Sequence, residues 1–271
     1  MRYLKGTIAL SDTRDYPLLR RVLHSTFITG EQLFEFMRLE YCASSRKAFE
    51  NRIRRLIAHQ LLTRHEIPTM SRGVVYAISP AGASELIARG EYYAGSPERA
   101  EAVGGHVRHA LELNEIHLAL KRTGILARWT PESDIRSRNE LTDIGYGKDY
   151  DATVDVRILG QEHRFALEYE RTPKAKVRYE IIRKRIEAQT QLQHFLYIAP
   201  NHDLLAFLRG RFHECSRVIH FGLYRDALTD GIDIPVQANR GATTLRFSEV
   251  LGGATRPCQR QIATLDRRVL P

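Results

Sequence analysis

The sequence predicts an α+β protein that is built from two domains. Residues 15–90 alternate between helical and strand-like hydrophobic patterns, and a second series of such patterns begins at residue 106. The stretch between them is rich in glycine and small polar residues, which is typical of a connector. A chain of 271 residues is long enough for two domains that each bury a core. The expected first domain, linker, second domain and carboxy-terminal extension are residues 1–90, 91–105, 106–229 and 230–271.

The overall composition is that of a globular protein without a membrane segment. Hydrophobic residues make up 43% of the chain and charged residues 27%, and no apolar run approaches the roughly 18 residues that a membrane helix needs. The first residues lack the long apolar core of a secretory signal, so we expect a cytoplasmic protein. Cys42, Cys215 and Cys258 are far apart and form no CxxC pair, which argues against a zinc ribbon or a disulfide framework.

The chain carries a formal net charge of +9, which favours a polyanionic partner. Each phosphate that a lysine or arginine neutralises releases counterions and strengthens binding at low salt. Many basic proteins bind no nucleic acid, so the charge by itself does not identify the partner.

Two helices are expected at the start of the first domain. Residues 15–25 carry leucine and valine side chains at helical spacing, which gives this helix one apolar side. The second helix begins after Thr29, which serves as its N-cap, and Gln32 stands three residues later to complete a capping box.

The third expected helix, residues 44–60, separates an apolar side from a basic and polar side. Ser44 or Ser45 serves as its N-cap. At the helical spacing of 100° per residue the apolar stripe consists of Phe49, Ile53, Leu56 and Gln60. The opposite stripe consists of Lys47, Asn51 and Arg54, with Ser44 and Arg55 beside it. Guanidinium and amide groups on one helix face read base edges in the major groove or bind phosphate oxygens, although an isolated stripe of this kind is also typical of a solvated surface.

A strand pair and a closing helix follow the third helix. Two apolar-polar runs flank a turn that carries Arg72 and Gly73, and Pro80 starts a helix that we expect to end at Gly90. Three helices, a hairpin and a last helix are the arrangement of a winged helix-turn-helix domain, whose third helix enters the groove while the wing contacts phosphates. The first domain is therefore expected to bind double-stranded DNA. The residues expected to contact the DNA are Ser44, Ser45, Lys47, Asn51, Arg54, Arg55, Arg64 and Arg72.

The second domain is expected to follow the order helix, three strands, helix, strand, helix, strand. The expected helices are residues 106–122, 177–191 and 202–215, and the expected strands are residues 127–133, 194–200 and 216–226, with a hairpin at residues 150–171 that turns at Leu159 to Glu162. Residues 134–150 are expected to be a polar excursion without regular structure. After residue 230 the sequence predicts one further strand or short helix and then a basic tail without a clear period.

Acidic residues of the hairpin form a candidate catalytic site. Asp151 starts the first strand, Glu168 lies near the end of the second, and Glu170 follows on the same side. Carboxylates that converge at strand ends provide the oxygen ligands of a Mg²⁺ ion, which would polarise phosphate and water during phosphodiester cleavage. Glu132, placed in the preceding strand, or Glu115, on the first helix of this domain, would complete the metal site with Asp151 and Glu168.

An ordinary structural role is the alternative for each of these acids. The three hairpin carboxylates would then pair with Arg157, Arg164 or Arg171 as solvent-facing ion pairs on the strands. The histidines of the first helix in this domain lack the spacing of a zinc site.

Residues 15–225 resemble the replication-relaxation family of plasmid and mobile-element proteins. The resemblance is carried by the third helix and wing (residues 44–79), the WTPES segment, the YDATVDV strand, and the FALEYERT segment with the basic helix after it. It implies a winged helix-turn-helix domain followed by a restriction-endonuclease-like, that is PD-(D/E)XK-like, α/β domain. It also implies that Asp151, Glu168 and Glu170 occupy the motif positions of a Mg²⁺-dependent nuclease site.

The chain departs from an active PD-(D/E)XK nuclease at two places. YDA stands where such nucleases have PD, and Glu170 stands where they have a catalytic lysine. That lysine orients the attacking water and offsets charge in the transition state, whereas a glutamate repels the phosphate. Lys174, Lys176 or Lys184 would have to replace it.

We therefore expect a sequence-specific DNA-binding protein that regulates transcription or replication of a plasmid or mobile element, with an inactive or repurposed nuclease-like domain. A homodimer would read two half-sites. One alternative is a Mg²⁺-dependent endonuclease that the first domain delivers to its target. Another is a protein-interaction scaffold, since winged helices also mediate protein contacts.

Overall fold

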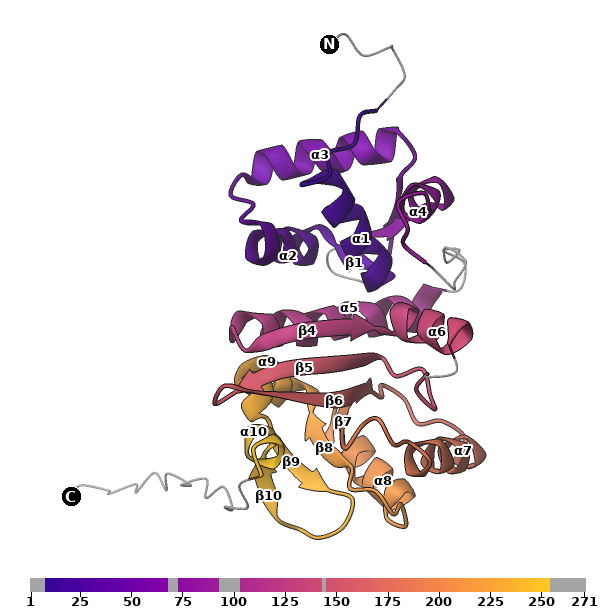
Figure 1. Cartoon of the computed structure of the whole chain (residues 1–271), viewed down its shortest axis with the longest axis vertical. Coiled ribbons are helices and arrows are strands. Elements are labelled where there is room, and N and C mark those ends of the chain that lie inside the picture. Colours follow the sequence, from indigo (N-terminus) through magenta and orange to yellow (C-terminus); the bar gives the residue numbers. More distant parts are fainter. Residues whose placement is uncertain (1–7, 68–72, 93–102, 143–144, 254–271) are drawn as a thin grey trace, which may run out of the picture.

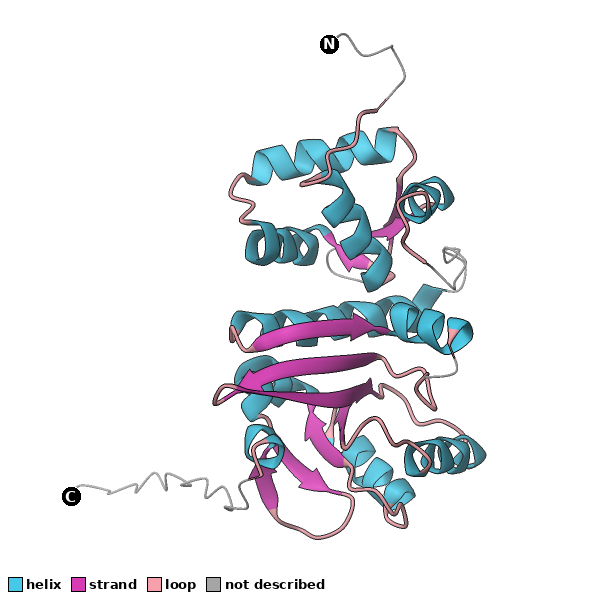
Figure 2. Ribbon diagram, viewed as in Figure 1, coloured by secondary structure: helices cyan, strands magenta, loops and turns pink. Residues whose placement is uncertain are grey.

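The computed structural model describes residues 8–67, 73–92, 103–142 and 145–253. Two sheets and a series of helices confirm the expected α+β class. Figure 1 shows the amino-terminal helices and a small sheet stacked on a larger sheet, and Figure 2 shows that helices surround this larger sheet. Within the described residues, no helix combines the length and apolar character that a membrane crossing requires.

The amino-terminal unit, residues 8–92, combines four helices with a three-stranded sheet in the part that the structure describes. Its elements are α1 (Asp15–Ser25), β1 (Ile28–Thr29), α2 (Gly30–Tyr41), α3 (Arg46–Ala58), β2 (Leu62–Glu66), β3 (Val74–Ile78) and α4 (Pro80–Ile87). The strands are antiparallel and have the order β1-β3-β2. Apolar side chains of all four helices and of the sheet form one core.

Polar caps start three of these helices. The Thr29 side chain accepts a hydrogen bond from the Gln32 N–H, and the Gln32 side chain accepts one from the Thr29 N–H, which confirms the predicted capping box. Ser45, and not Ser44, caps α3. Ser79 caps α4, and Pro80 follows it as the first residue of the helix.

Three details of the amino-terminal unit differ from the sequence prediction. The sequence does not predict β1, because two residues carry no periodic signal and the strand exists only through its pairing with β3. Gln60 lies beyond α3 with a φ of 58° and is exposed, so it does not belong to the apolar stripe of that helix. Helix α4 ends at Ile87 instead of Gly90.

The second unit is built on a seven-stranded mixed sheet. Its elements are α5 (Val103–Arg122), β4 (Leu126–Pro131), α6 (Glu132–Leu141), β5 (Ala152–Ile158), β6 (Gln161–Tyr169), α7 (Lys176–Glu187), β7 (His194–Ala199), α8 (His202–Phe212), β8 (His220–Leu223), α9 (Tyr224–Asp230), β9 (Pro235–Ala238), β10 (Thr244–Arg246) and α10 (Phe247–Leu251). The strand order is β10-β9-β8-β7-β6-β5-β4, and only β6, β7 and β8 are parallel. Helices α6, α7 and α8 cover one face, and α5, α9 and α10 cover the other.

Three parts of the second unit differ from the sequence prediction. The strand expected at residues 216–226 is limited to β8, and its last three residues begin α9. Residues 134–150, expected to lack regular structure, contain most of α6, which buries Ile135 in the core of one sheet face. The boundary expected at residue 229 does not separate an extension, because β9 pairs with β8 and β10 pairs with β9. Residues 254–271 of the expected extension lie outside the described residues.

The β5–β6 hairpin forms where the sequence predicts it. Ile158 faces Gln161 in the antiparallel register, so Leu159 and Gly160 make a two-residue turn. Both residues have positive φ, 49° and 80°, which is the backbone conformation that this class of turn requires. The turn fixes the register of the two strands that carry the acidic residues.

Helix α5 contacts both the amino-terminal unit and the large sheet. Its Leu118 belongs to the amino-terminal core, whereas Ile116 and Leu120 belong to the core between α5 and the large sheet. The connector expected at residues 91–105 is described only at its ends, since residues 93–102 lie outside the described residues. This helix therefore makes most of the contact between the two units, and α6 adds a contact of Asp134 with His24 of α1 at 3.4 Å.

Two buried hydrogen bonds add direction to the packing of α5. Gln32 Nε2 donates to the Leu111 carbonyl oxygen at 2.9 Å. Asn114 Nδ2 donates to the Phe27 carbonyl oxygen at 2.9 Å. Because a buried amide that loses its partner costs about 1–3 kcal/mol, these bonds disfavour any other docking of the amino-terminal unit on α5.

His220 on β8 should make the stability of the fold pH-dependent. The residue is 7% exposed, its Nδ1 has no hydrogen-bond partner among the described residues, and burial lowers its pKa to about 4. As the pH falls, His220 of the unfolded chain gains a proton near pH 6.5, whereas His220 of the folded chain gains it only near pH 4. The folded state therefore loses, between pH 6.5 and pH 4, the stability that it has above pH 6.5.

Between pH 7 and pH 4, the unmodified protein should therefore lose about 3 kcal/mol more free energy of unfolding than the His220→Gln variant. Chemical denaturation at constant ionic strength would measure both losses. His213→Gln, which changes an exposed histidine, should behave like the unmodified protein. If His220→Gln loses as much stability as the unmodified chain, the buried imidazole is not the source of the effect.

Candidate functional site

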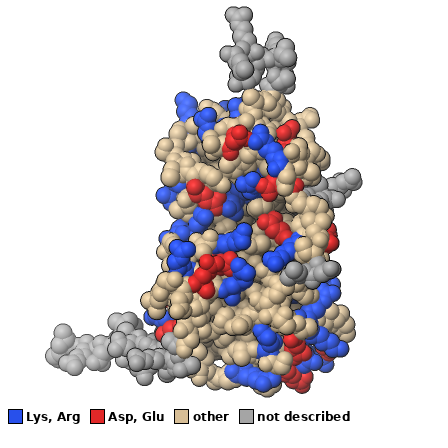
Figure 3. Space-filling model, viewed as in Figure 1, with Lys and Arg blue, Asp and Glu red and all other residues tan. Residues whose placement is uncertain are grey.

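The polar side of α3 is one of two places where functional side chains gather. The helix lies at the outer end of the amino-terminal unit, away from the large sheet (Figure 1). Its apolar residues Phe49, Ile53 and Leu56 are buried, as predicted. The predicted polar residues that reach solvent together are Ser44, Ser45, Lys47, Asn51 and Arg54. Figure 3 shows lysine and arginine side chains at this end of the molecule, interspersed with acidic ones.

Asn51 and Arg54 act as a pair on this surface. Arg54 Nη2 donates to Asn51 Oδ1 at 2.6 Å, which orients both side chains and leaves further N–H donors for a ligand. Lys47 forms no ion pair within the part of the chain that the structure describes. A groove of about 540 Å³ lies between the amino-terminal segment and α3. Arg14 and Asn51 both line this groove. Sequence reasoning misses Arg14 because it precedes the first helix.

Three other predicted DNA-contacting arginines have different surroundings. Arg55 Nη2 lies 2.7 Å from Oδ2 of Asp15, a buried carboxylate on α1, so Arg55 holds α3 against α1. Arg64 on β2 pairs with Glu66 at 2.9 Å on the exposed side of the hairpin. Arg72 lies outside the described residues.

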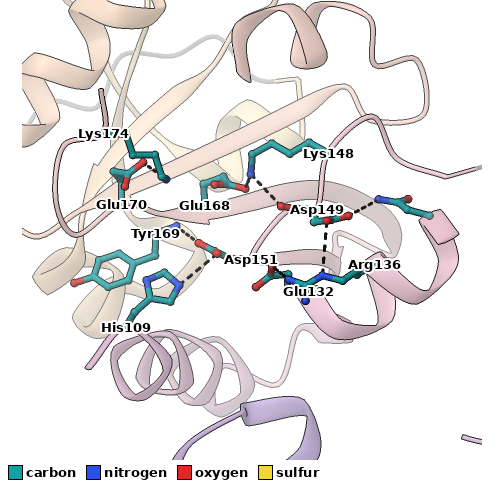
Figure 4. A network of polar contacts seen from close by, with 11 residues as sticks. His109, Glu132, Arg136, Lys148, Asp149, Asp151, Glu168, Tyr169, Glu170 and Lys174 are labelled. Atoms are coloured by element: carbon teal, nitrogen blue, oxygen red, sulfur yellow. Dashed lines mark hydrogen bonds and ion pairs between the residues drawn. The ribbon is translucent and has the colours of Figure 1, made fainter. Parts of the chain in front are cut away.

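Asp151, Glu168 and Glu170 form the second group, where β5 begins and β6 ends (Figure 4). The antiparallel register places the start of β5 beside the end of β6, so the three carboxylates converge as the sequence predicts. The Tyr169 N–H donates to Asp151 Oδ2 at 2.6 Å. Glu168 and Glu170 are each only 5% exposed. Because buried carboxylates need compensating partners, this cluster is a strong local constraint on the fold.

Each of these carboxylates has its own cation. The pairs are His109 Nε2 with Asp151 Oδ1 (3.3 Å), Lys148 Nζ with Glu168 Oε1, and Lys174 Nζ with Glu170 Oε2 (2.5 Å). The alternative of solvent-facing pairs with strand arginines is wrong for these acids. Arg164 pairs with Asp155 instead. Arg171 pairs with Glu112 on α5.

Burial and the neighbouring charges shift the pKa values in the cluster. Burial raises the pKa of Glu168 to about 7; the charge of Lys148 opposes this rise and the charge of Asp151 adds to it. Burial also acts to raise the pKa of Asp151, but the hydrogen bond and charge of His109 outweigh it and lower that pKa. Burial acts to lower the pKa of His109, and the Asp151 carboxylate outweighs it and raises that pKa. His109 and Asp151 thus stabilise each other's charged form.

The carboxylates do not form the expected Mg²⁺ shell. Among the residues that the structure describes, no three His, Cys, Asp or Glu side chains are placed to hold one ion. Glu132 begins α6 instead of ending a strand, and its carboxylate bonds to Arg136. Glu115 accepts a hydrogen bond from the Tyr224 hydroxyl. The predicted shell is not formed because each of its three carboxylates contacts a different cation of the chain.

Lys148 is the functional candidate that sequence reasoning misses. It lies in the loop before β5, within the segment expected to be an unstructured excursion, and its side chain is mostly buried against Glu168. A lysine in the GKDYD run is the signal in the sequence, but spacing alone does not show which acid it reaches. Lys174, one of the three predicted replacements for the catalytic lysine, bonds to Glu170. The other two, Lys176 and Lys184, are exposed on α7.

Comparison of the chain with protein-family models, with curated protein sequences and with solved structures found no match. The resemblance to the replication-relaxation family stays a prediction from short motifs. The polar side of α3 and the buried carboxylate cluster are the features of the chain that bear on its function.

Removing the Lys148 charge should destabilise the protein through Glu168. Lys148→Met leaves a buried carboxylate without its cation, so we expect the free energy of unfolding to fall by about 3 kcal/mol. The double variant Lys148→Met/Glu168→Gln removes both charges and should recover most of this loss. Chemical denaturation at pH 8, where Glu168 is ionised in the unmodified protein, would measure each effect.

Lys176→Met serves as the matched control, because it removes an exposed cation of the same second unit. It should change stability by less than about 0.5 kcal/mol. Equal destabilisation in the single and double variants would mean that Lys148 contributes packing and not charge.

Proposed function

We propose that this protein binds double-stranded DNA through its amino-terminal unit. In this proposal the unit is a winged helix-turn-helix domain, α3 is its recognition helix, and the β2–β3 hairpin is its wing. The observation that carries the proposal is the division of α3 into a side buried in the core and a side that presents Lys47, Asn51 and Arg54 to solvent. A rigid helix with donor groups on its outer side fits the major groove.

The connection between α2 and α3 supports this assignment. Residues 42–45 join the two helices, and Cys42 adopts a left-handed conformation with a φ of 52°. A turn of this length between two helices is typical of a helix-turn-helix. The buried side of α3 and the ion pairs between Arg52, Arg55 and Asp15 fix the helix against α1. The side chains that would read DNA are thus presented from a rigid element.

The three side chains on the polar side suit different parts of the DNA. An arginine guanidinium pairs with the guanine edge and an asparagine amide with the adenine edge, so Arg54 and Asn51 are the proposed base readers. Their mutual hydrogen bond of 2.6 Å sets their relative position. Lys47 and Arg14 carry the charge that would bind phosphate oxygens beside the groove.

For the second unit, which is built on the seven-stranded sheet, we propose a PD-(D/E)XK-like domain that does not cleave DNA. Glu170 stands at the position of the catalytic lysine, and the buried carboxylates are neutralised by cations of the chain. The unit would then support the DNA-binding unit through α5. In this proposal the protein regulates transcription or replication of a plasmid or mobile element, and a second copy would supply the second half-site contact.

Loss of the two outer cations of α3 should abolish tight DNA binding. Lys47→Ala/Arg54→Ala removes one phosphate contact and one base contact, each worth about 1–3 kcal/mol, so affinity should fall by about a hundredfold. The slope of log affinity against log salt should fall by about one, because only the Lys47 contact is with a phosphate. Fluorescence anisotropy with a labelled duplex at several salt concentrations would measure both quantities.

Arg157→Ala/Arg225→Ala is the matched control, because it removes two exposed cations from the second unit. It lowers the net charge equally and should change affinity by only a few-fold. If both double variants lose affinity to the same extent, the binding reflects overall charge and not the α3 surface.

Incubation of the protein with supercoiled and linear DNA, with Mg²⁺ or Mn²⁺ and with a chelator, should give gel retardation without cleavage. The reason is that the cluster lacks a free set of metal-binding carboxylates among the described residues. Metal-dependent nicking that disappears in Asp151→Ala would instead identify an endonuclease. Absence of both retardation and nicking would favour a protein-interaction scaffold.

A further inference from the structure

The outward side of α7 (Lys176–Glu187) combines exposed apolar side chains with cations. The helix covers one face of the large sheet and buries Tyr179, Ile182 and Ile186 against it. Figure 3 shows lysine and arginine side chains at the lower right, where Figure 1 places this helix. The proposed DNA-binding surface on α3 lies at the opposite end of the molecule (Figure 1). The outward side of α7 therefore belongs neither to that surface nor to the core.

Val177, Ile181 and Lys184 form the outermost row of α7. Val177 is 66% exposed, Ile181 is 48% exposed, and Lys184 is also exposed. At 100° per residue the three lie within about 60° of one another, opposite the buried side of the helix. Residues four positions apart are neighbours on a helix surface, so Val177 and Ile181 form one continuous apolar strip.

Cations without a counter-charge border this strip. Five of the 12 residues of α7 are lysine or arginine, and two are glutamate. Arg183 pairs with Glu214 near the end of α8 at 2.8 Å. The remaining cations are exposed and form no ion pair within the part of the chain that the structure describes: Lys176, Arg178, Lys184 and Arg185.

The neighbouring helix α8 continues the same pattern. Its Phe207 is 37% exposed, and the ring contacts that of Tyr179 on α7 with 5.8 Å between centroids. The Arg211 guanidinium lies 5.2 Å from the Phe207 ring centroid. An apolar centre with a charged rim, spread over two helices, is the composition of a protein–protein interface.

A purely solvated helix surface does not explain the apolar strip. Valine and isoleucine have lower helix propensity than alanine, lysine or glutamate, so Val177 and Ile181 do not serve to stabilise α7. Their exposure shows that they contribute little to the core. Contiguous exposed apolar side chains rimmed by polar ones mark interaction sites.

The charge of the surface decides between the possible partners. A symmetric contact with a second copy would place the same cations against one another. A DNA backbone would neutralise the cations but would set Val177 and Ile181 against charged phosphates. An amphipathic helix with acidic residues beside its apolar side matches both the strip and the cations.

We propose that the outward surface of α7 and α8 binds an acidic amphipathic helix of a partner protein. The apolar side of that helix covers Val177 and Ile181, and its carboxylates pair with the four exposed cations of α7. This interaction goes beyond the proposed DNA binding. It uses the second unit, so the protein can hold DNA at α3 and the partner at α7 together.

Fluorescence anisotropy of the full chain with a labelled three-heptad peptide tests the proposal. The peptide has leucine at positions a and d, glutamate at e and g, and alanine or glutamine elsewhere; glutamate at e and g prevents it from pairing with itself. It should bind at least about tenfold more tightly than a peptide with lysine at e and g. A peptide of the same composition with its leucines redistributed should also bind at least about tenfold more weakly, because it lacks an apolar side. Rising salt should weaken the binding.

Two double variants connect the binding to α7. Lys184→Glu/Arg185→Glu should weaken peptide binding by at least about tenfold, because it reverses two charges at the rim. Val177→Ser/Ile181→Ser should weaken it by about fivefold or more, because it removes the apolar strip. Arg157→Glu/Arg225→Glu reverses two exposed cations elsewhere on the second unit and should leave binding within a few-fold. Chemical denaturation would confirm that each variant is folded.

Equal binding of the three peptides, or unchanged binding in Lys184→Glu/Arg185→Glu, would overturn the proposal. A DNA duplex that displaces the acidic peptide from the Lys47→Ala/Arg54→Ala variant would assign the α7 surface to DNA instead. The peptide titrations contain no DNA, and their outcome is therefore independent of whether α3 binds DNA.

Discussion

The burial of α5 between two cores is the constraint on which the rest of the structure depends. One side of this helix completes the amino-terminal core through Leu118, and another side completes a core of the large sheet through Ile116 and Leu120. A helix that is apolar on two sides is stable only if both are buried, so the amino-terminal unit packs on one side of α5 and the large sheet on the other. The buried amide hydrogen bonds of Gln32 and Asn114 then select one docking among the apolar alternatives.

The carboxylate cluster follows from the same packing. Because α5 packs on one face of the sheet, it brings His109 to Asp151, while the loop before β5 brings Lys148 to Glu168. A buried charge is tolerated only when another charge or strong donor compensates it. The site is consequently balanced within the chain, which explains why the acids converge without forming an open metal shell among the described residues.

The cavity beside this cluster, between the amino-terminal unit and the large sheet, is balanced in the same way. Arg21 pairs with Glu40, Glu132 with Arg136, and Asp151 with His109. The Ser25 hydroxyl at its wall is buried without a hydrogen-bond partner in the described part of the chain.

The sequence by itself determined the α+β class, most helices and strands, the Thr29 capping box, the outward side of α3 and the convergence of Asp151 with Glu168. These features depend on side-chain periods and hydrogen bonds within a few residues, or on one tight hairpin. Only the tertiary structure decided that Arg55 binds Asp15, that Lys148 binds Glu168, and that β9 and β10 extend the sheet. Such contacts join segments distant along the chain, and their partners are selected by burial and mutual approach, which no local pattern records.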